Sequence, residues 1–325
     1  MPMSELLEIV LRCVLVIGAF MTLPLLVGQM EHKQMAHMQS RVGPMYAGRF
    51  HGWAQLIADG VKFMQKESVT PAAADRPVFA LAPAVAIVPY VVAMVAIPLG
   101  PVFGSDVLVG TDLDAGLFFV LAAMSVGVIG TLMAGVASAN KYSYIGGLRV
   151  AAQLMSYELP MVLAASSVAM AAGTLSLVGI AEAWEPWWLL VQLPGLVVFF
   201  VAGLAELMRP PFDAPLADAE LVMGPLTEYG GMRFAMFLLT EYAGIVLLAA
   251  LTAVLFLGGW AGPWSAQVGA VWMLLKIVAL SFLVIWARVA YPRLREDQLN
   301  ALAWKVLVPA ALLQVTITTI VVVVT

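Results

Sequence analysis

The sequence predicts an all-α protein that crosses a membrane about eight times. Hydrophobic residues make up 62% of its 325 residues and charged residues only 11%, with a mean hydropathy of +0.97. Such a chain is too apolar for one water-soluble core, and several long runs carry almost no charge. Because lipid cannot satisfy backbone polar groups, and the runs lack the alternation of barrel strands, we expect helices.

Eight apolar segments are long enough to cross about 30 Å of hydrocarbon, within one integral-membrane domain over residues 1–325. The predicted spans are residues 5–28, 78–99, 116–138, 156–178, 187–208, 233–257, 268–290 and 304–324. No basic segment precedes the first span and no small-residue cleavage site ends it, so we interpret it as a span rather than a signal peptide.

The basic residues are divided unequally between the loops. The odd-numbered loops and the helix ends beside them hold every Lys and Arg except Arg12 and Lys276. The even-numbered loops and both tails hold none. By the positive-inside rule, we expect the odd-numbered loops in the cytoplasm and both termini outside.

The first loop, residues 29–77, contains an amphipathic segment from Phe50 to Lys66. At helical spacing, Trp53, Ile57, Val61 and Met64 fall on one side, and Asp59, Lys62, Lys66 and Glu67 on the other. We therefore predict a helix that lies on the membrane surface. Periodicity alone leaves open whether this helix does more than anchor the loop.

Two charged residues lie inside predicted spans. Glu158, near the start of the fourth span, is either an acid favoured by the helix dipole or a functional group that faces the bundle interior. Lys276 lies several residues inside the seventh span, where snorkelling is awkward, so we hypothesise an interior partner such as a carboxylate. In the seventh loop, Arg293 and its neighbouring cations are typical of positive-inside anchors.

The most unusual feature is an acidic stretch around the loop of residues 209–232. Six carboxylates face only two cations, Arg209 and Arg233, in this stretch; they are Glu206, Asp213, Asp218, Glu220, Glu228 and Glu241. Three prolines prevent residues 209–215 from continuing the fifth span as a regular helix. We expect Phe212 and Asp213 in an irregular segment at the membrane edge, where protein or water must cover the backbone.

Three interpretations of the acidic stretch remain open. We expect Asp213, Glu220 and Glu228 to line a polar cavity or packed interface, where mutual repulsion raises some pKa values and permits proton exchange. Glu206 and Glu241 then extend a carboxylate path into the bilayer, as in proton relays. A solvated loop and a docking surface for a basic partner are the alternatives, although neither accounts easily for Glu241.

The residue inventory gives no sign of a bound cofactor. The single cysteine, Cys13, excludes an internal disulfide, and the three histidines all lie between residues 32 and 51, without zinc or haem spacing. The sequence contains neither a Gly-rich dinucleotide fingerprint after a strand nor a Walker A loop. We expect no metal and no redox centre in this chain.

The motifs of the four odd-numbered loops resemble one known family closely. They are Gln39-Ser40-Arg41-Val42-Gly43-Pro44; Ala58-Asp59 with Lys62; Gly146-Gly147-Leu148-Arg149; Ser156-Tyr157-Glu158; Ala205-Glu206 through Pro215; Ala219-Glu220; Thr227-Glu228-Tyr229-Gly230-Gly231; and Pro292-Arg293 with Asp297-Gln298-Leu299. In these residues the chain is similar to the H subunits of proton-pumping NADH-quinone oxidoreductases, the bacterial counterparts of mitochondrial NADH dehydrogenase subunit 1. Where that family usually has an acid after Pro215, this chain has Leu216.

The resemblance implies an eight-helix subunit of a bacterial cell membrane that joins a peripheral redox arm to antiporter-like membrane subunits. It implies that quinone, as substrate, enters between the first span, the amphipathic helix and the sixth span, while partner subunits carry the iron-sulfur clusters and flavin. The implied quinone-cavity residues are Arg41, Gly43, Pro44, Asp59, Lys62, Phe212, Asp213, Glu220, Glu228 and Arg293. The implied proton-coupling residues are Glu158, Glu206, Asp213, Asp218, Glu220, Glu228 and Glu241, to which we add Lys276.

Two other functions stay open at this point. One is a stand-alone ion transporter that uses the same carboxylates with Lys276, although no inverted repeat is recognisable. The other is the related anchor subunit of a membrane-bound hydrogenase, which does not need quinone.

Overall fold

The computed structural model describes residues 3–101 and 106–324, except for the side chains of residues 3–9, 11, 218 and 219. The long helices are α1 (Met3–Met38), α3 (Arg76–Met94), α4 (Gly116–Ala137), α5 (Lys141–Ala172), α7 (Trp188–Glu206), α9 (Gly231–Phe256), α10 (Ser265–Ala290) and α12 (Val308–Val324). The shorter elements are α2 (Gln55–Gln65), α6 (Leu177–Ala183), α8 (Asp218–Leu221), α11 (Glu296–Leu302), the 3₁₀ turn η1 (Gly224–Leu226) and the π-helical turn η2 (Ala303–Leu307). Strands β1 (Gly100–Pro101) and β2 (Val107–Leu108) form a small antiparallel hairpin.

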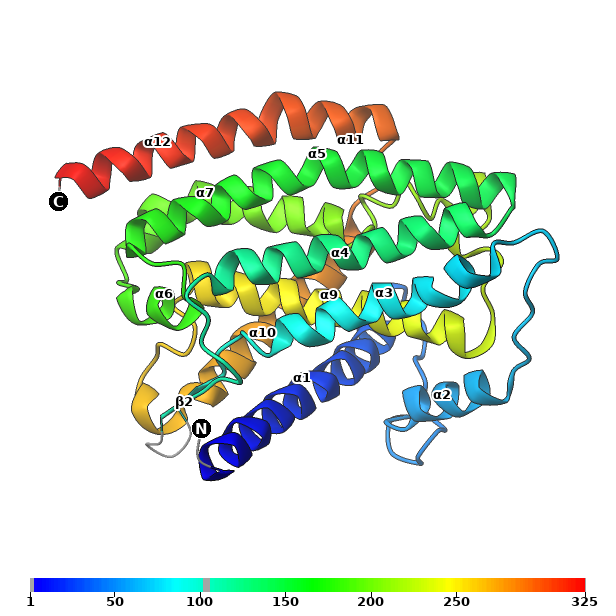
Figure 1. Ribbon diagram of the computed structural model, residues 1–325, viewed down its shortest axis with the longest axis horizontal. Helices are drawn as coiled ribbons and strands as arrows, with labels where there is room; N and C mark the ends of the chain where they lie inside the picture. The colour runs from blue at the N-terminus through cyan, green and yellow to red at the C-terminus, as the bar shows by residue number, and fades with distance from the viewer. Residues whose placement is uncertain (1–2, 102–105, 325) are drawn as a thin grey trace.

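Eight helices of the described part are long and apolar enough to cross a membrane, which confirms the predicted fold class. The chain runs back and forth between two ends of the bundle (Figure 1). One end carries α2, α8 and α11, and we call it the α2 end. The other end carries α6, the β1–β2 hairpin and both ends of the chain, and we call it the termini end.

Three long helices extend further into the α2 end than hydropathy predicted. The first continues to Met38 rather than residue 28, the fourth begins at Lys141 rather than 156, and the last begins at Glu296 rather than 304. Hydropathy marks only the part of a helix that suits hydrocarbon, whereas caps and packing let the helix continue outside it. At the start of α5, for example, the Asn140 side chain accepts a hydrogen bond from the Tyr142 N–H.

The amphipathic segment forms a helix, but only over Gln55–Gln65. Residues 49, 51 and 52 have positive φ values, so the chain turns there instead of starting the helix at Phe50. On α2 the apolar side chains of Ile57, Val61 and Met64 are exposed. Three residues of the predicted apolar face therefore lie on this helix and are available to lipid or another surface, whereas Trp53 precedes the helix.

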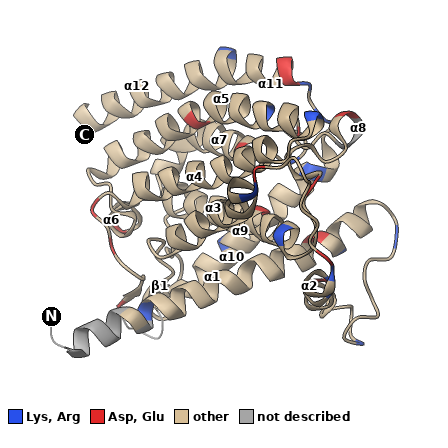
Figure 2. Cartoon of the chain, turned by 45° about the vertical axis from the view of Figure 1, so that its right-hand side comes forward, with Lys and Arg blue, Asp and Glu red and all other residues tan. Residues whose placement is uncertain are grey.

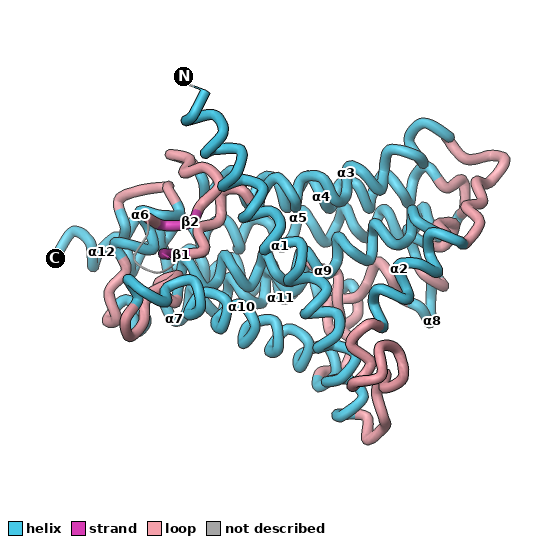
Figure 3. Tube along the Cα trace, turned by 90° about the horizontal axis from the view of Figure 1, so that it is seen from below, coloured by secondary structure: helices cyan, strands magenta, loops and turns pink. Residues whose placement is uncertain are grey.

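Helix α9 forms the centre of the bundle. It packs against α1, α3, α7 and α10, and residues 243–256 are all buried. Helix α1 crosses at a slant beside α9 and α10 (Figure 3). Exposed leucines on the outer helices, such as Leu26, Leu275 and Leu313, suit lipid as the surrounding solvent.

The acidic loop begins where α7 ends at Glu206. The chain has no regular helix from residue 207 to 217, as the prolines predict. Charged residues are concentrated towards α2, α8 and α11 (Figure 2). Candidate functional groups with charged side chains are therefore concentrated at this end.

Candidate functional site

Arg209 is the most deeply buried charged residue of the site, with 1% of its surface exposed. It stands three residues beyond α7, at the start of the irregular segment. Its guanidinium donates to Glu31 Oε2 on α1 at 2.5 Å and to Glu241 Oε1 on α9 at 2.6 Å. The same group lies over the Tyr242 ring, 5.1 Å from its centroid. Arg209 therefore joins three segments that are far apart in the sequence.

A second arginine extends this contact into a four-residue ion network. Glu31 also accepts a hydrogen bond from Arg288 at the end of α10. The order Arg288, Glu31, Arg209, Glu241 alternates in sign, so each carboxylate has a cation beside it. Such pairing offsets the large desolvation cost of charge inside an apolar bundle. We call these four residues the ion network.

Sequence reasoning missed Glu31 and treated Arg209 and Arg288 only as local counter-charges or anchors. A signal was present in α1, because the residues at 16, 20, 23 and 27 form a buried apolar stripe that Glu31 continues at helical spacing. An acid on the buried face of a helix needs a partner. The partners were hidden because they come from distant parts of the chain.

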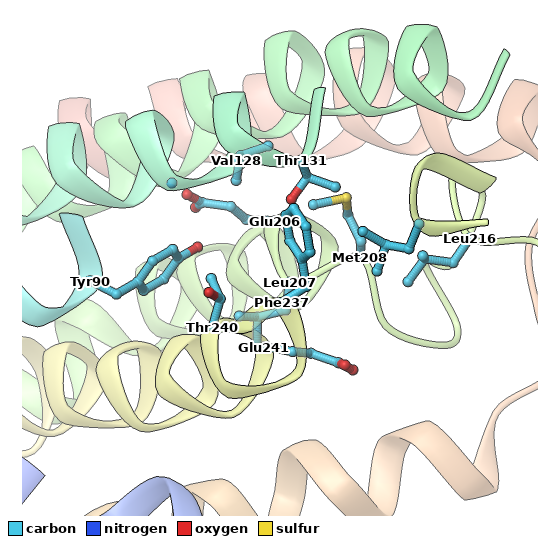
Figure 4. A pocket seen from close by; sticks show the side chains of 12 residues that line it. Tyr90, Val128, Thr131, Glu206, Leu207, Met208, Leu216, Phe237, Thr240 and Glu241 are labelled. Atoms are coloured by element: carbon cyan, nitrogen blue, oxygen red, sulfur yellow. The ribbon is translucent and has the colours of Figure 1, made fainter. Parts of the chain in front are cut away.

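Glu206 lines a small internal cavity of about 60 Å³ between α3, α4, α7 and α9. Only 4% of its surface is exposed, and neither carboxylate oxygen has a hydrogen-bond partner among the described residues. Figure 4 shows its carboxylate and the Tyr90 hydroxyl beside the same space, with Thr131 and Thr240 nearby. The volume and the polar groups suit a few water molecules.

Two of the predicted proton-coupling residues meet at this cavity, which we call the Glu206 cavity. Glu241 contributes to its lining, but its carboxylate points away from Glu206, in keeping with its bond to Arg209 (Figure 4). Leu216, where the resembled family has an acid, also lines it. An apolar side chain thus stands between the membrane carboxylates and the acidic loop.

Glu158 on α5 is a further carboxylate inside the bundle. It accepts a hydrogen bond from the Ser125 hydroxyl of α4 at 2.7 Å, and its charge acts on Glu206. Carboxylates of α5 and α7 therefore interact electrostatically inside the bundle. The carboxylate path expected from the sequence stays a prediction.

The loop carboxylates are dispersed rather than gathered in one cavity. Glu220 accepts from Arg149 at 2.6 Å, with Arg293 at 3.8 Å, and is half exposed. Glu228 accepts instead from the Asn140 amide at 2.6 Å. The hydrogen bond from Arg149 lowers the pKa of Glu220, the opposite of the rise expected for crowded acids.

Other loop residues hold the irregular backbone. Phe212 is buried edge-on against Tyr157, with ring centroids 5.7 Å apart. The Gln153 amide donates to the carbonyls of Ala205 and Phe212, at 2.6 and 2.8 Å. Asp213 beside it is partly buried. The side chain of Asp218 lies outside the described residues.

The first-loop candidates lie around the end of α1 and on α2. Pro44 offers its carbonyl to Lys33, and Gly43 packs so closely on α1 that a Cβ would contact Lys33 and Ala36. Arg41 is exposed and donates to the Gln39 side chain at 2.7 Å. Asp59 and Lys62 form an ion pair of 2.8 Å on α2. Partial burial opposes ionisation of Asp59, but hydrogen bonds from Lys62 and Gln55 outweigh it and lower its pKa.

A larger apolar cavity of about 370 Å³ lies between α1, α2 and α9. Its lining is mostly aliphatic and aromatic; it includes Pro24, Leu25, Leu56, Phe63, Met232, Met236, Leu239 and Tyr242. His32 and Asp59 supply polar groups. We call this space the portal cavity. Its Tyr242 is the residue that stacks beneath Arg209, so the portal cavity adjoins the ion network.

Lys276 has backbone partners rather than the carboxylate that we hypothesised. Its ammonium donates to the carbonyls of Leu257, Gly259 and Ala261, and the described residues give it no ion pair. These carbonyls belong to the turn after α9 at the termini end. Lys276 therefore lies near the opposite end of the bundle from the acidic loop.

Comparison with known proteins gives consistent matches over nearly the whole chain. The sequence model of a family described as NADH dehydrogenase matches residues 11–319. The chain is 43% identical over 318 residues to the second H subunit of NADH-quinone oxidoreductase from Rhizobium meliloti, covering 96% of this chain and 97% of that protein. It is also 43% identical to the H subunit of the Anoxybacillus flavithermus enzyme, over 310 residues, 94% of this chain and 91% of the relative. For the H subunit from Bacillus cereus, the identity is 43% over 294 residues, 90% of this chain and 87% of the relative.

Proposed function

This chain belongs to the NADH dehydrogenase family, and from that membership we propose that it forms the quinone-access cavity of an NADH-quinone oxidoreductase and couples quinone reduction to proton translocation. The proposed partners are the peripheral subunits that carry flavin and iron-sulfur clusters and the antiporter-like membrane subunits. This chain holds no cofactor of its own in the proposal, and quinone is its substrate.

The portal cavity supports the first half of the proposal. It opens between α1, α2 and α9, the elements expected to form the quinone entrance, and its apolar walls suit an isoprenoid tail. Helix α2 exposes apolar side chains beside it, so the entrance can lie at the level of the lipid. The polar groups of Asp59 and His32 offer hydrogen bonds to a more polar part of the same molecule.

The observation that carries the coupling half is the position of two adjacent residues on α9. Tyr242 lines the portal cavity, and Glu241 lines the Glu206 cavity. Arg209 contacts both, over the ring of one and at 2.6 Å from the carboxylate of the other. A change of charge in the portal cavity therefore acts on Arg209, alters the balance of its bonds to Glu31 and Glu241, and biases protonation along Glu241, Glu206 and Glu158.

The reaction defines which charges must move. Reduction of a quinone to a quinol takes up two electrons and two protons; in the proposal, the electrons come from partner subunits. The protons enter from the α2 end, where Asp213, Glu220, Glu228 and Arg293 border the path. The α2 end faces the cytoplasm of a bacterial cell in this proposal, because the basic residues gather there (Figure 2).

The matched variants Glu241→Gln and Glu182→Gln in the assembled complex test the proposal. Glu182 is an exposed acid at the termini end, so it controls for loss of a carboxylate as such. We expect Glu241→Gln to reduce proton translocation by more than about tenfold, because the relay loses a titratable group, and Glu182→Gln to behave as the parent. The measurements are NADH-driven quinone reduction and proton uptake in sealed vesicles.

The same assays on Asp213→Asn and Glu228→Gln test the loop. If all three substitutions left both activities at parental values in a fully assembled complex, the coupling role would be wrong. Activity of the purified chain without redox partners would instead favour the stand-alone transporter.

A further inference from the structure

The end of α9 carries a group of converging carbonyls that the proposed function does not use. Lys276 Nζ lies 2.7 Å from Leu257 O, 2.7 Å from Gly259 O and 2.9 Å from Ala261 O. An ammonium has three N–H donors, and all three find an acceptor here. A neutral amine has only two N–H donors, and its lone pair would face the third carbonyl.

The backbone around Lys276 is built to aim these carbonyls inwards. Gly258 and Gly259 have φ values of 69° and 52°, which reverse the chain directly after α9. The N–H of Gly259 returns to Ala253 O at 2.8 Å, and the Trp184 indole donates to Phe256 O at 3.2 Å. The carbonyls of Leu257, Gly259 and Ala261 in this turn accept their hydrogen bonds from the Lys276 ammonium.

The side chain direction and the helix end both suit a cation at this point. Helical side chains lean towards the N-terminus of their own helix, and Lys276 reaches back along α10 in this way to the turn that precedes it. The C-terminal end of α9 carries partial negative charge, which attracts the ammonium.

We propose that the carbonyls of Leu257, Gly259 and Ala261 form a monovalent-cation site, which the chain fills permanently with its own Lys276 ammonium. The oxygen distances of 2.7–2.9 Å are longer than Ca²⁺ or Mg²⁺ requires, and neutral carbonyls without a carboxylate suit a single charge. Lys276 is then a fixed charge that positions the end of α9, instead of the proton carrier expected from the sequence. This assignment stands independently of the quinone cavity.

Chemical restoration of the ammonium tests the site. In the full chain with Cys13→Ser, the variant Lys276→Cys is alkylated with 2-bromoethylamine, which forms a thioether, releases bromide and rebuilds a lysine-like ammonium. Alkylation with 1-bromopropane gives a neutral side chain of the same length. The unfolding midpoint is followed by tryptophan fluorescence in detergent, and Lys305→Cys, at an exposed lysine of η2, receives the same treatments as the control.

We expect the midpoint of Lys276→Cys to fall by about 5 °C, to stay low after propylation and to return to the parent value after aminoethylation. The Lys305→Cys chain should show no difference between the two reagents. Lys276→Ala leaves the carbonyls empty, so ammonium chloride should raise its midpoint above that in choline chloride. Equal midpoints for the charged and neutral alkyl groups, or for ammonium and choline, would overturn the proposal.

A measurement on the parent chain does not depend on any variant folding. With ¹⁵N-labelled lysine side chains, a fully bonded Lys276 should give an ammonium signal with three protons that are protected from exchange with water. A proton carrier exchanges its protons, so the absence of any protected lysine signal would refute the fixed charge.

Discussion

At the scale of single residues, the ion network pairs opposite charges inside an apolar bundle, where an unpaired charge would have a high desolvation cost. Arg209 is fully enclosed, and its partners Glu31 and Glu241 come from two different helices. Removing Arg209 leaves the buried Glu31 and the partly buried Glu241 without that compensation. The network therefore joins α1, α9 and α10 to the segment that follows α7.

Arg209→Met should destabilise the chain by about 3–5 kcal/mol, because Glu31 and Glu241 lose a shared buried cation. Arg295→Met is the matched control, since Arg295 is exposed and its ion pair among the described residues is with Asp297, two residues away. Denaturant unfolding of the purified chain in detergent measures both. Similar losses for the two variants would mean that burial of the Arg209 pairs carries no special weight.

The ion pair between Glu220 and Arg149 at the α2 end should make the stability of the folded chain depend on pH. The hydrogen bond from Arg149 lowers its pKa in the folded chain, relative to an ordinary glutamate value of 4.5. The ion pair therefore stabilises the folded chain at pH values above the ordinary pKa of glutamate. This stabilisation is lost as the pH falls through the lowered pKa of the folded chain. A double-mutant cycle of Glu220→Gln and Arg149→Met should show coupling at pH 7 that disappears in acid; coupling that persists in acid would contradict the assignment.

At the scale of elements, close helix packing depends on glycines at particular contacts. Gly127 and Gly130 of α4 lie against Tyr90 and Ala86 of α3, where a Cβ would overlap the neighbouring atoms. Such small residues let two helices approach without a hydrophobic driving force between them. The α3–α4 contact also supplies part of the wall of the Glu206 cavity, which Tyr90 and Gly127 line.

Gly130→Ala should destabilise the chain by about 1–3 kcal/mol, because the added methyl group meets the Ala86 backbone, which cannot move aside easily. Gly18→Ala in α1 is the control, since nothing lies within 4 Å of a Cβ there and alanine favours the helix. Thermal unfolding of both variants compares them directly. Equal stability of the two would show that α3 and α4 separate at little cost.

At the scale of the whole molecule, eight long helices place the chemistry at one end and both ends of the chain at the other. Helix α9 links the two ends through its buried half. Its cytoplasm-facing part, in the proposed orientation, borders both cavities, while the turn beyond Phe256 is held by Lys276 and Trp184. A change of charge beside the cavities would therefore act on α9, whose far end is fixed by hydrogen bonds from Lys276 and Trp184.

Single-cysteine labelling tests this orientation. In a Cys13→Ser background, Glu185→Cys at the termini end should react with a membrane-impermeant maleimide on intact spheroplasts, because that end faces outwards in the proposed orientation. Ser68→Cys in the loop after α2 should be protected there and react only in inverted vesicles. The reverse labelling pattern would show that the bundle has the opposite orientation in the membrane.

Sequence alone was sufficient for the number of spans and for the irregular segment after α7. Hydropathy, charge bias and proline geometry are local properties, and each can be evaluated from neighbouring residues. The motifs also identified the family, which the comparisons confirm. Local patterns did not predict the helical extensions of α1, α5 and α11, because these depend on caps and packing outside the hydrocarbon.

Only the tertiary structure decided which charges meet. Glu31 and Arg209 are 178 residues apart and Glu31 and Arg288 are 257 apart, so no local pattern relates them. Lys276 binds three carbonyls instead of the hypothesised carboxylate, and Glu220 pairs with Arg149, because folding brings the turn after α9 and Arg149 beside them. The sequence determined where charge enters the membrane, and the packing of distant segments determined how each charge is compensated.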